Sequence, residues 1–259
     1  MRRYLLSMAL GTALCLGLTT AASAGNIVVD YTGQKTGAQN VSFDLVGDGM
    51  GTRTTSAGLF TFTTDSTTFP LDPLGVGTSV WAFCIQLEQS ISGNNLDFTI
   101  GDLADGRIPD IDNRGTLGLD RAKRIDMLFN LAFASNGGLI DYNASSLILR
   151  AVQIAIWEIA YEAGNGTLNL GSGNISFSNS GGAITEVNNA GWLTTINNTN
   201  LNTYTPTLFL WSMNSDTKQD FVVQTTAGLQ EEVPEPGTMA LSGLALVGLA
   251  LLRRRAARA

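Results

Sequence analysis

The chain has 259 residues, contains no histidine and holds only two cysteines, Cys15 and Cys84. The lack of histidine excludes a Ser-His-Asp or Cys-His nucleophile system and argues against a zinc site. Residues 25–233 carry nine lysines and arginines against twenty-one aspartates and glutamates, a net charge near −12, which argues against nucleic acid as a partner.

Residues 1–24 have the three parts of a secretory signal peptide. Arg2 and Arg3 are positively charged, residues 4–19 are uncharged and largely apolar, and residues 22–24 are small. The pattern predicts cleavage between Ala24 and Gly25, and the small residues argue against a permanent membrane helix. After cleavage Cys84 is the one remaining cysteine, so an intramolecular disulfide is impossible and the residue calls for another explanation.

The region that follows is rich in short strand patterns. Runs of β-branched and aromatic residues, separated by Gly and Asn clusters, predict strands at 27–31, 41–45 and 58–63. A more apolar run at 80–87 predicts a strand buried on both faces.

The middle of the chain changes to a helical period. Apolar residues at three- and four-residue spacings predict one helix at 119–133 and another at 144–163, with Asn143 as N-cap and Gly164 as stop. Residues 165–202 indicate loops around weak strands or a short helix near 184–196, and two strands follow at 207–211 and 220–224. We therefore expect residues 25–232 to form an α+β, mostly β domain, a β-sandwich or barrel-like fold with an inserted helical pair.

The C-terminal segment, 233–259, reads as a membrane-directed tail. Pro234 and Pro236 break regular structure, residues 238–252 are uncharged and apolar, and four arginines follow. Because a bilayer core needs roughly 20 helical residues, this short stretch predicts a single transmembrane helix that serves as a temporary anchor. Its arginines are expected on the cytoplasmic side; a permanent anchor is the alternative.

The order Pro234-Glu235-Pro236, apolar span and arginine cluster resembles the PEP-CTERM sorting signal of Gram-negative bacteria. The resemblance covers 233–259 and implies processing by a membrane enzyme, exosortase. It also implies an exported protein of the cell envelope, the cell surface or the extracellular matrix, often alongside exopolysaccharide.

Cys84 and Gln153 are the candidate site. By composition alone, Cys84 is an ordinary core residue and Gln153 an ordinary helix residue facing solvent. However, Phe83-Cys84-Ile85, followed by residues 152–159 (VQIAIWEI), resembles the thioester domain of bacterial surface adhesins over roughly 78–162. The resemblance implies a spontaneous thioester between the two side chains. Gln86 and Gln89 are nearer acyl donors in sequence, but a strand would hold Gln86 on the same face as Cys84 without folding back.

The chemistry needs no histidine. A thiolate attacks the carboxamide and ammonia leaves, high effective molarity replaces a catalytic base, and burial beside Trp81, Phe83 and Trp157 protects the bond from water. We therefore expect a surface or matrix protein, not an enzyme, that couples to amine groups of a partner protein or polysaccharide in adhesion or biofilm. No cofactor, metal or catalytic residue is expected.

Three other functions stay open at this point. The alternative function is a non-covalent structural or carbohydrate-binding matrix protein in which Cys84 is a core residue. An irregular calcium site near Asp110 and Asp112 is a lesser possibility, because Arg114 and Arg121 stand where an EF-hand loop needs ligands. The same two aspartates give only weak grounds for a glycosidase.

Overall fold

The computed structural model describes residues 25–35, 39–67, 77–87, 89–108, 115–162, 164 and 166–225. They all belong to the first of the chain's two compact units, Met1–Thr226; the second is Ala227–Ala259. Among the described residues, none of the helices has the length and apolar character needed to cross a membrane. The expected signal peptide, sorting motif and transmembrane helix lie outside the described residues.

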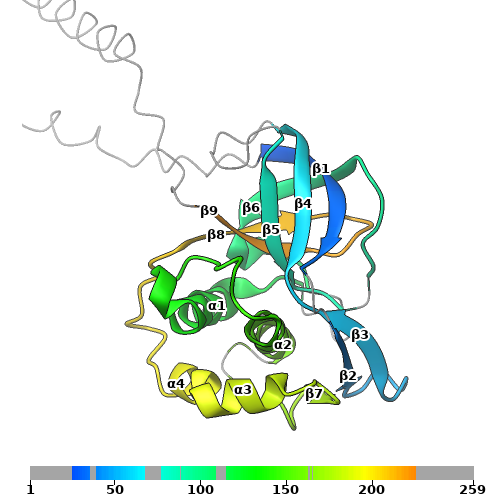
Figure 1. Cartoon of the computed structure of the whole chain (residues 1–259). Coiled ribbons are helices and arrows are strands. Elements are labelled where there is room, and N and C mark those ends of the chain that lie inside the picture. Colours follow the sequence, from blue (N-terminus) through cyan, green and yellow to red (C-terminus); the bar gives the residue numbers. More distant parts are fainter. Residues whose placement is uncertain are drawn as a thin grey trace, which may run out of the picture. The chain divides into compact units, whose positions relative to one another are not determined.

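The largest element of the described chain is a closed antiparallel β-barrel (Figure 1). Its strand order is β1-β4-β5-β9-β8-β6, and β6 pairs back with β1 to close the ring. Closure gives each of these strands a neighbour on both sides along most of its length. The strands in that order are β1 Gly25–Gln34, β4 Phe60–Thr67, β5 Ser79–Cys84, β9 Phe221–Thr225, β8 Phe209–Asn214 and β6 Leu96–Asp102.

Aromatic side chains fill the barrel. Phe62, Phe98 and Phe221 come from strands that are not neighbours, yet their ring centroids lie 5.1–6.5 Å apart, and all three pairs meet edge to face. Contacts between non-adjacent strands must cross the interior, so these three rings form the barrel core. All three are at most 1% exposed.

Two helices pack beside the barrel, below it in Figure 1. They are α1 (Gly118–Ala132) and α2 (Ser146–Tyr161), and α2 contacts α1, β5 and a further helix, α3. Because neighbours surround it, α2 is buried from Leu149 to Tyr161 and is apolar on most of its circumference.

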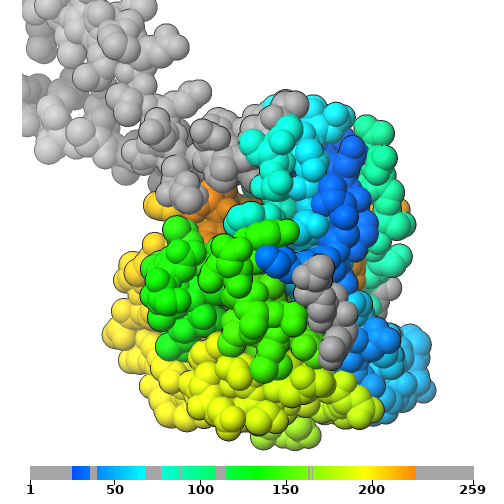
Figure 2. Space-filling model, viewed as in Figure 1, coloured from blue at the N-terminus to red at the C-terminus, as the bar shows by residue number. Residues whose placement is uncertain are grey.

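An outer layer completes this unit. Helices α3 (Ala183–Ala190) and α4 (Trp192–Asn197) cover the side of α1 and α2 away from the barrel, and Figure 2 shows them as a continuous yellow surface. A three-stranded antiparallel sheet of order β3-β2-β7 lies next to α3, and α2 contacts both of its outer strands. The remaining elements are β2 Gln39–Leu45, β3 Arg53–Ala57, β7 Ile175–Ser178, and the 3₁₀ turns η1 Leu103–Asp105 and η2 Ala134–Asn136.

The expected mostly β fold with an inserted helical pair is confirmed, and it closes as a barrel rather than a sandwich. Several boundaries were predicted wrongly. Helix α2 is capped by Ser145, whose Oγ accepts from the Ile148 N–H, and not by Asn143. The strand predicted at 80–87 ends at Cys84. Strands β3 and β6 were not predicted. Strand β7 lies in the stretch 165–202 where weak strands were expected, and two short helices, not one, follow it.

Candidate functional site

Cys84 is the last residue of β5 and lies beyond the point where β5 is paired with the neighbouring strand β4. The β4–β5 pair nearest to Cys84 is Phe60 with Ala82, so Cys84 lies two residues past the part of β5 that is paired with β4. On the other side Cys84 pairs with Phe221 of β9. Directly opposed residues share a face, so the Cys84 side chain lies on the inner face with the Phe221 ring, and it is fully buried.

Gln153 of α2 takes the place of the missing strand. Its Oε1 accepts from the Cys84 backbone N–H at 2.9 Å, and its Nε2 donates to the Cys84 carbonyl at 2.7 Å. Both residues have no exposed surface. The structure therefore brings the two predicted site residues together, and the interpretation of Gln153 as a solvent-facing helix residue is wrong.

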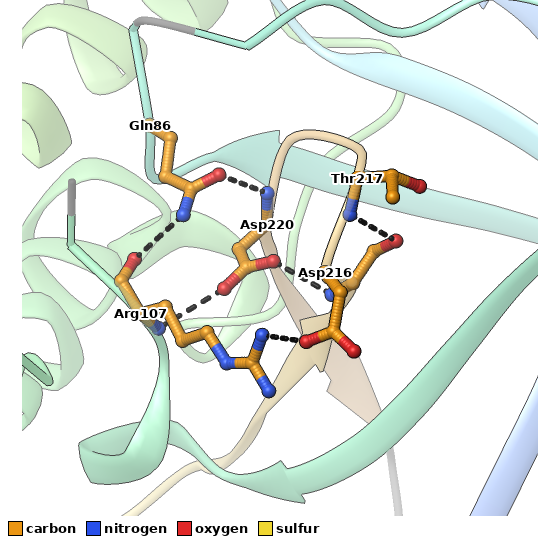
Figure 3. A network of polar contacts seen from close by, with 6 residues as sticks. Gln86, Arg107, Asp216, Thr217 and Asp220 are labelled. Atoms are coloured by element: carbon orange, nitrogen blue, oxygen red, sulfur yellow. Dashed lines mark hydrogen bonds and ion pairs between the residues drawn. The ribbon is translucent and has the colours of Figure 1, made fainter.

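The Gln86 amide is directed elsewhere. Its Oε1 accepts from the Asp220 N–H at 2.9 Å, and its Nε2 donates to the Arg107 carbonyl at 3.3 Å (Figure 3). Gln86 therefore does not continue the strand, which is why the strand predicted at 80–87 is too long. Its backbone carbonyl points back to Cys84, whose Sγ donates to it at 2.6 Å.

The three aromatic residues expected around the site each have a ring partner. Phe83 lies on the outer face of β5 and contacts Phe129 of α1 edge to face at 5.8 Å. Trp81 stacks on Tyr142 at 4.5 Å. Trp157 stacks on Phe177 of β7 at 6.4 Å and is fully buried. The role of these residues in protecting a bond from water stays a prediction.

Two carboxyl groups of this unit are buried, Asp220 beside Gln86 and Glu158 on α2. Burial raises the pKa of Asp220 to about 6, although N–H groups of Ser215 and Arg107 donate to its carboxylate and act in the opposite direction. Burial also raises the pKa of Glu158, on α2, to about 8, with an opposing contribution from the Asn169 N–H. Glu158 is thus mostly protonated at neutral pH. Sequence reasoning missed both residues, since neither has a local motif.

The other predicted positions carry less information. Gly25 is the first residue of β1 and pairs with Ile100 of β6, so the predicted cleavage would leave this strand whole. Ala24, Pro234, Glu235, Pro236 and the loop containing Asp110 and Asp112 lie outside the described residues. Within the described ranges no group of three Cys, Asp or Glu side chains is placed to hold a metal ion.

Comparison with known proteins bears on the C-terminal tail. Residues 232–255 match the PEP-CTERM protein-sorting motif. The motif identifies an exported protein of the cell envelope or extracellular space of a Gram-negative bacterium, processed by an exosortase. No curated protein and no solved structure matches the chain.

Proposed function

We propose that this PEP-CTERM protein forms an internal thioester between Cys84 and Gln153 and uses it to couple covalently to amine groups at the cell surface or in the matrix. The observation that carries the proposal is the pair of hydrogen bonds that fixes the Gln153 carboxamide on the Cys84 backbone, at 2.9 and 2.7 Å. Residues 69 apart in the chain meet here with both side chains buried. Such fixed proximity supplies a high effective molarity.

The reaction balances without any further group. The Cys84 sulfur attacks Cδ of Gln153, the C–S bond forms, the C–N bond breaks, and the thiol proton leaves with the amide nitrogen as ammonia. Negative charge develops on Oε1 during the attack, and the Cys84 N–H already donates to that oxygen at 2.9 Å. A donor aimed at developing charge stabilises the transition state.

Coupling to a partner follows from the same electrophile. A primary amine attacks the Gln153 carbonyl carbon, a C–N bond replaces the C–S bond, and the amine proton returns to the Cys84 sulfur. A lysine of a surface protein or an amino sugar of a polysaccharide has the required group. The three lysines of the predicted mature chain, Lys35, Lys123 and Lys218, offer few competing amines within the protein.

A second function is favoured by the same hydrogen bonds. The Gln153 amide satisfies the N–H and carbonyl that β4 leaves open on Cys84, and buried backbone groups need such partners. In that case Gln153 is a structural bridge between α2 and the barrel, and the protein is a non-covalent structural or carbohydrate-binding component of the matrix.

Intact mass of the purified exported protein separates the two. A thioester leaves the chain lighter than its sequence by one ammonia, and methylamine converts it to an adduct with a released thiol. Cys84→Ala and Gln153→Met each restore the full mass. A parent protein of full mass whose single thiol titrates in denaturant overturns the covalent proposal and leaves the structural one.

Tryptic mapping identifies the acyl partner. No lysine or arginine lies between Arg53 and Arg107 or between Arg150 and Lys218, so trypsin gives fragments 54–107 and 151–218. A link from Cys84 to Gln153 joins these two fragments. A link to Gln86 or Gln89 stays inside the first fragment, and that result would move the acyl partner to one of them.

A further inference from the structure

The peptide unit between Gln86 and Leu87 holds the sulfur of Cys84. Its carbonyl accepts from Cys84 Sγ at 2.6 Å. A cysteine side chain otherwise chooses among three staggered χ1 rotamers, and this hydrogen bond selects one of them. The direction of the Gln86 carbonyl therefore decides where the sulfur lies.

Two side chains hold that peptide unit at its two ends. Gln219 Nε2 donates to the Gln86 carbonyl oxygen at 3.2 Å, so this oxygen accepts from both Cys84 and Gln219. The Leu87 N–H donates to the hydroxyl of Tyr161 at 2.9 Å. Tyr161 has no exposed surface and Gln219 is 6% exposed, so water does not readily replace either partner.

The side chain of Gln86 is also held, by hydrogen bonds separate from those of its peptide unit. Its amide bridges the Asp220 N–H and the Arg107 carbonyl, and the Asp220 carboxylate accepts from the Arg107 N–H at 3.0 Å (Figure 3). Asp220 is fully buried. Gln86 thus belongs to a connected buried network, and Gln219 and Tyr161 set the orientation of its peptide unit.

We infer that Tyr161 and Gln219 are positioning residues that orient the Cys84 sulfur for reaction with Gln153. Gln153 and Tyr161 both belong to α2, so a single helix fixes the carboxamide and, through the Leu87 N–H, the group that orients the thiol. The inference rests on the proposed function for its purpose. Freeing the sulfur among three rotamers would slow ring closure about threefold.

The test compares matched substitutions. Tyr161→Phe and Gln219→Met keep side-chain volume and remove the contacts to the 86–87 peptide unit. Tyr204→Phe removes a hydroxyl that donates to Asp126, and Gln224→Met removes an amide that bridges Ile140 and Gly138, both away from Cys84. A pulse of isotope-labelled synthesis followed by intact-mass measurement gives the half-time of ammonia loss in the exported protein.

We expect this half-time to lengthen about threefold in Tyr161→Phe and in Gln219→Met, and to stay at the parent value in Tyr204→Phe and Gln224→Met. Parent-like half-times in the first two variants, or equal effects in all four, overturn the inference while the thioester itself stands.

An infrared measurement tests the orientation without the thioester. In Gln153→Glu the buried carboxylic acid accepts from the Cys84 N–H and donates to its carbonyl as the amide does, and the thiol is retained. The S–H stretching band of Cys84 reports donation to the Gln86 carbonyl, because a hydrogen-bonded S–H absorbs at lower frequency. Adding Tyr161→Phe or Gln219→Met should raise this frequency, and adding Tyr204→Phe or Gln224→Met should not.

The mass measurement and the S–H band test the thioester and the positioning role independently. A parent protein that never loses ammonia sinks the proposed function, and the S–H band then decides the orientation in the parent itself. A band that the first two substitutions leave unmoved overturns the role of Tyr161 and Gln219, whether or not the thioester forms.

Discussion

Replacing Glu158 by Gln should remove a pH dependence of folding stability. Glu158 is fully buried, its Oε1 accepts from the Asn169 N–H at 2.6 Å, and its Oε2 has no hydrogen-bond partner among the described residues. Burial raises the pKa of this carboxyl from 4.5 to about 8. The folded protein therefore keeps a proton on Glu158 at a pH where the unfolded chain has released it.

The sign and size follow from proton linkage. Between pH 4.5 and 8 the unfolded state binds fewer protons at this residue, so the free energy of unfolding falls as pH rises. The loss is about 1.4 kcal/mol for each pH unit, or about 3 kcal/mol between pH 5 and 7. Asp220, whose pKa is raised to about 6, acts in the same direction at lower pH. Its contribution is common to both proteins and cancels in the comparison.

Urea unfolding of the parent and of Glu158→Gln at several pH values between 5 and 7 measures the effect. Gln keeps an acceptor for Asn169 and cannot ionise, so the stability difference between the two proteins should change by about 3 kcal/mol over this range in favour of the variant. Glu186→Gln, on the outer helix α3, controls for the loss of one negative charge. Parallel pH curves for the parent and Glu158→Gln would refute the reasoning.

Three further substitutions test other parts of the described chain. Gln153→Met removes the two hydrogen bonds between the carboxamide and the Cys84 backbone and should lower the free energy of unfolding by about 2–4 kcal/mol in urea titrations. A loss below about 0.5 kcal/mol would contradict the bridge. Asp126→Ala, on α1, removes the carboxylate that accepts from the N–H groups of Thr207 and Leu208, so urea titration should show a loss of about 3 kcal/mol, whereas a parent-like midpoint would argue against this contact. Gly173→Ala combines a φ of 116° with a Cβ that would collide with the Glu162 carboxylate, so thermal unfolding should show a Tm several degrees lower, and an unchanged Tm would mean that the loop adjusts freely.

The candidate pair was predictable from sequence because two short motifs marked it, Phe83-Cys84-Ile85 and the helix segment 152–159. The residues that hold the pair were not. Gln86 was considered only as a competing acyl donor, and its role in the network depends on Asp220, which is 134 residues away. Gln219 and Tyr161 likewise act through backbone groups of distant residues, and backbone contacts leave no pattern of residue types to read.

The sequence by itself determined the sorting signal and the local secondary structure. Charge, apolar length and proline placement are properties of contiguous residues, so the sorting tail could be recognised without a fold. Helical periodicity likewise predicted each bound of α1 and α2 to within two residues. Strand order is different, because closing the barrel joins β1 to β6 and β5 to β9 across long stretches of chain. Tertiary structure alone decided that the pairing of β4 with β5 stops at Phe60 and Ala82, two residues before Cys84, which gives Gln153 a place beside the end of β5.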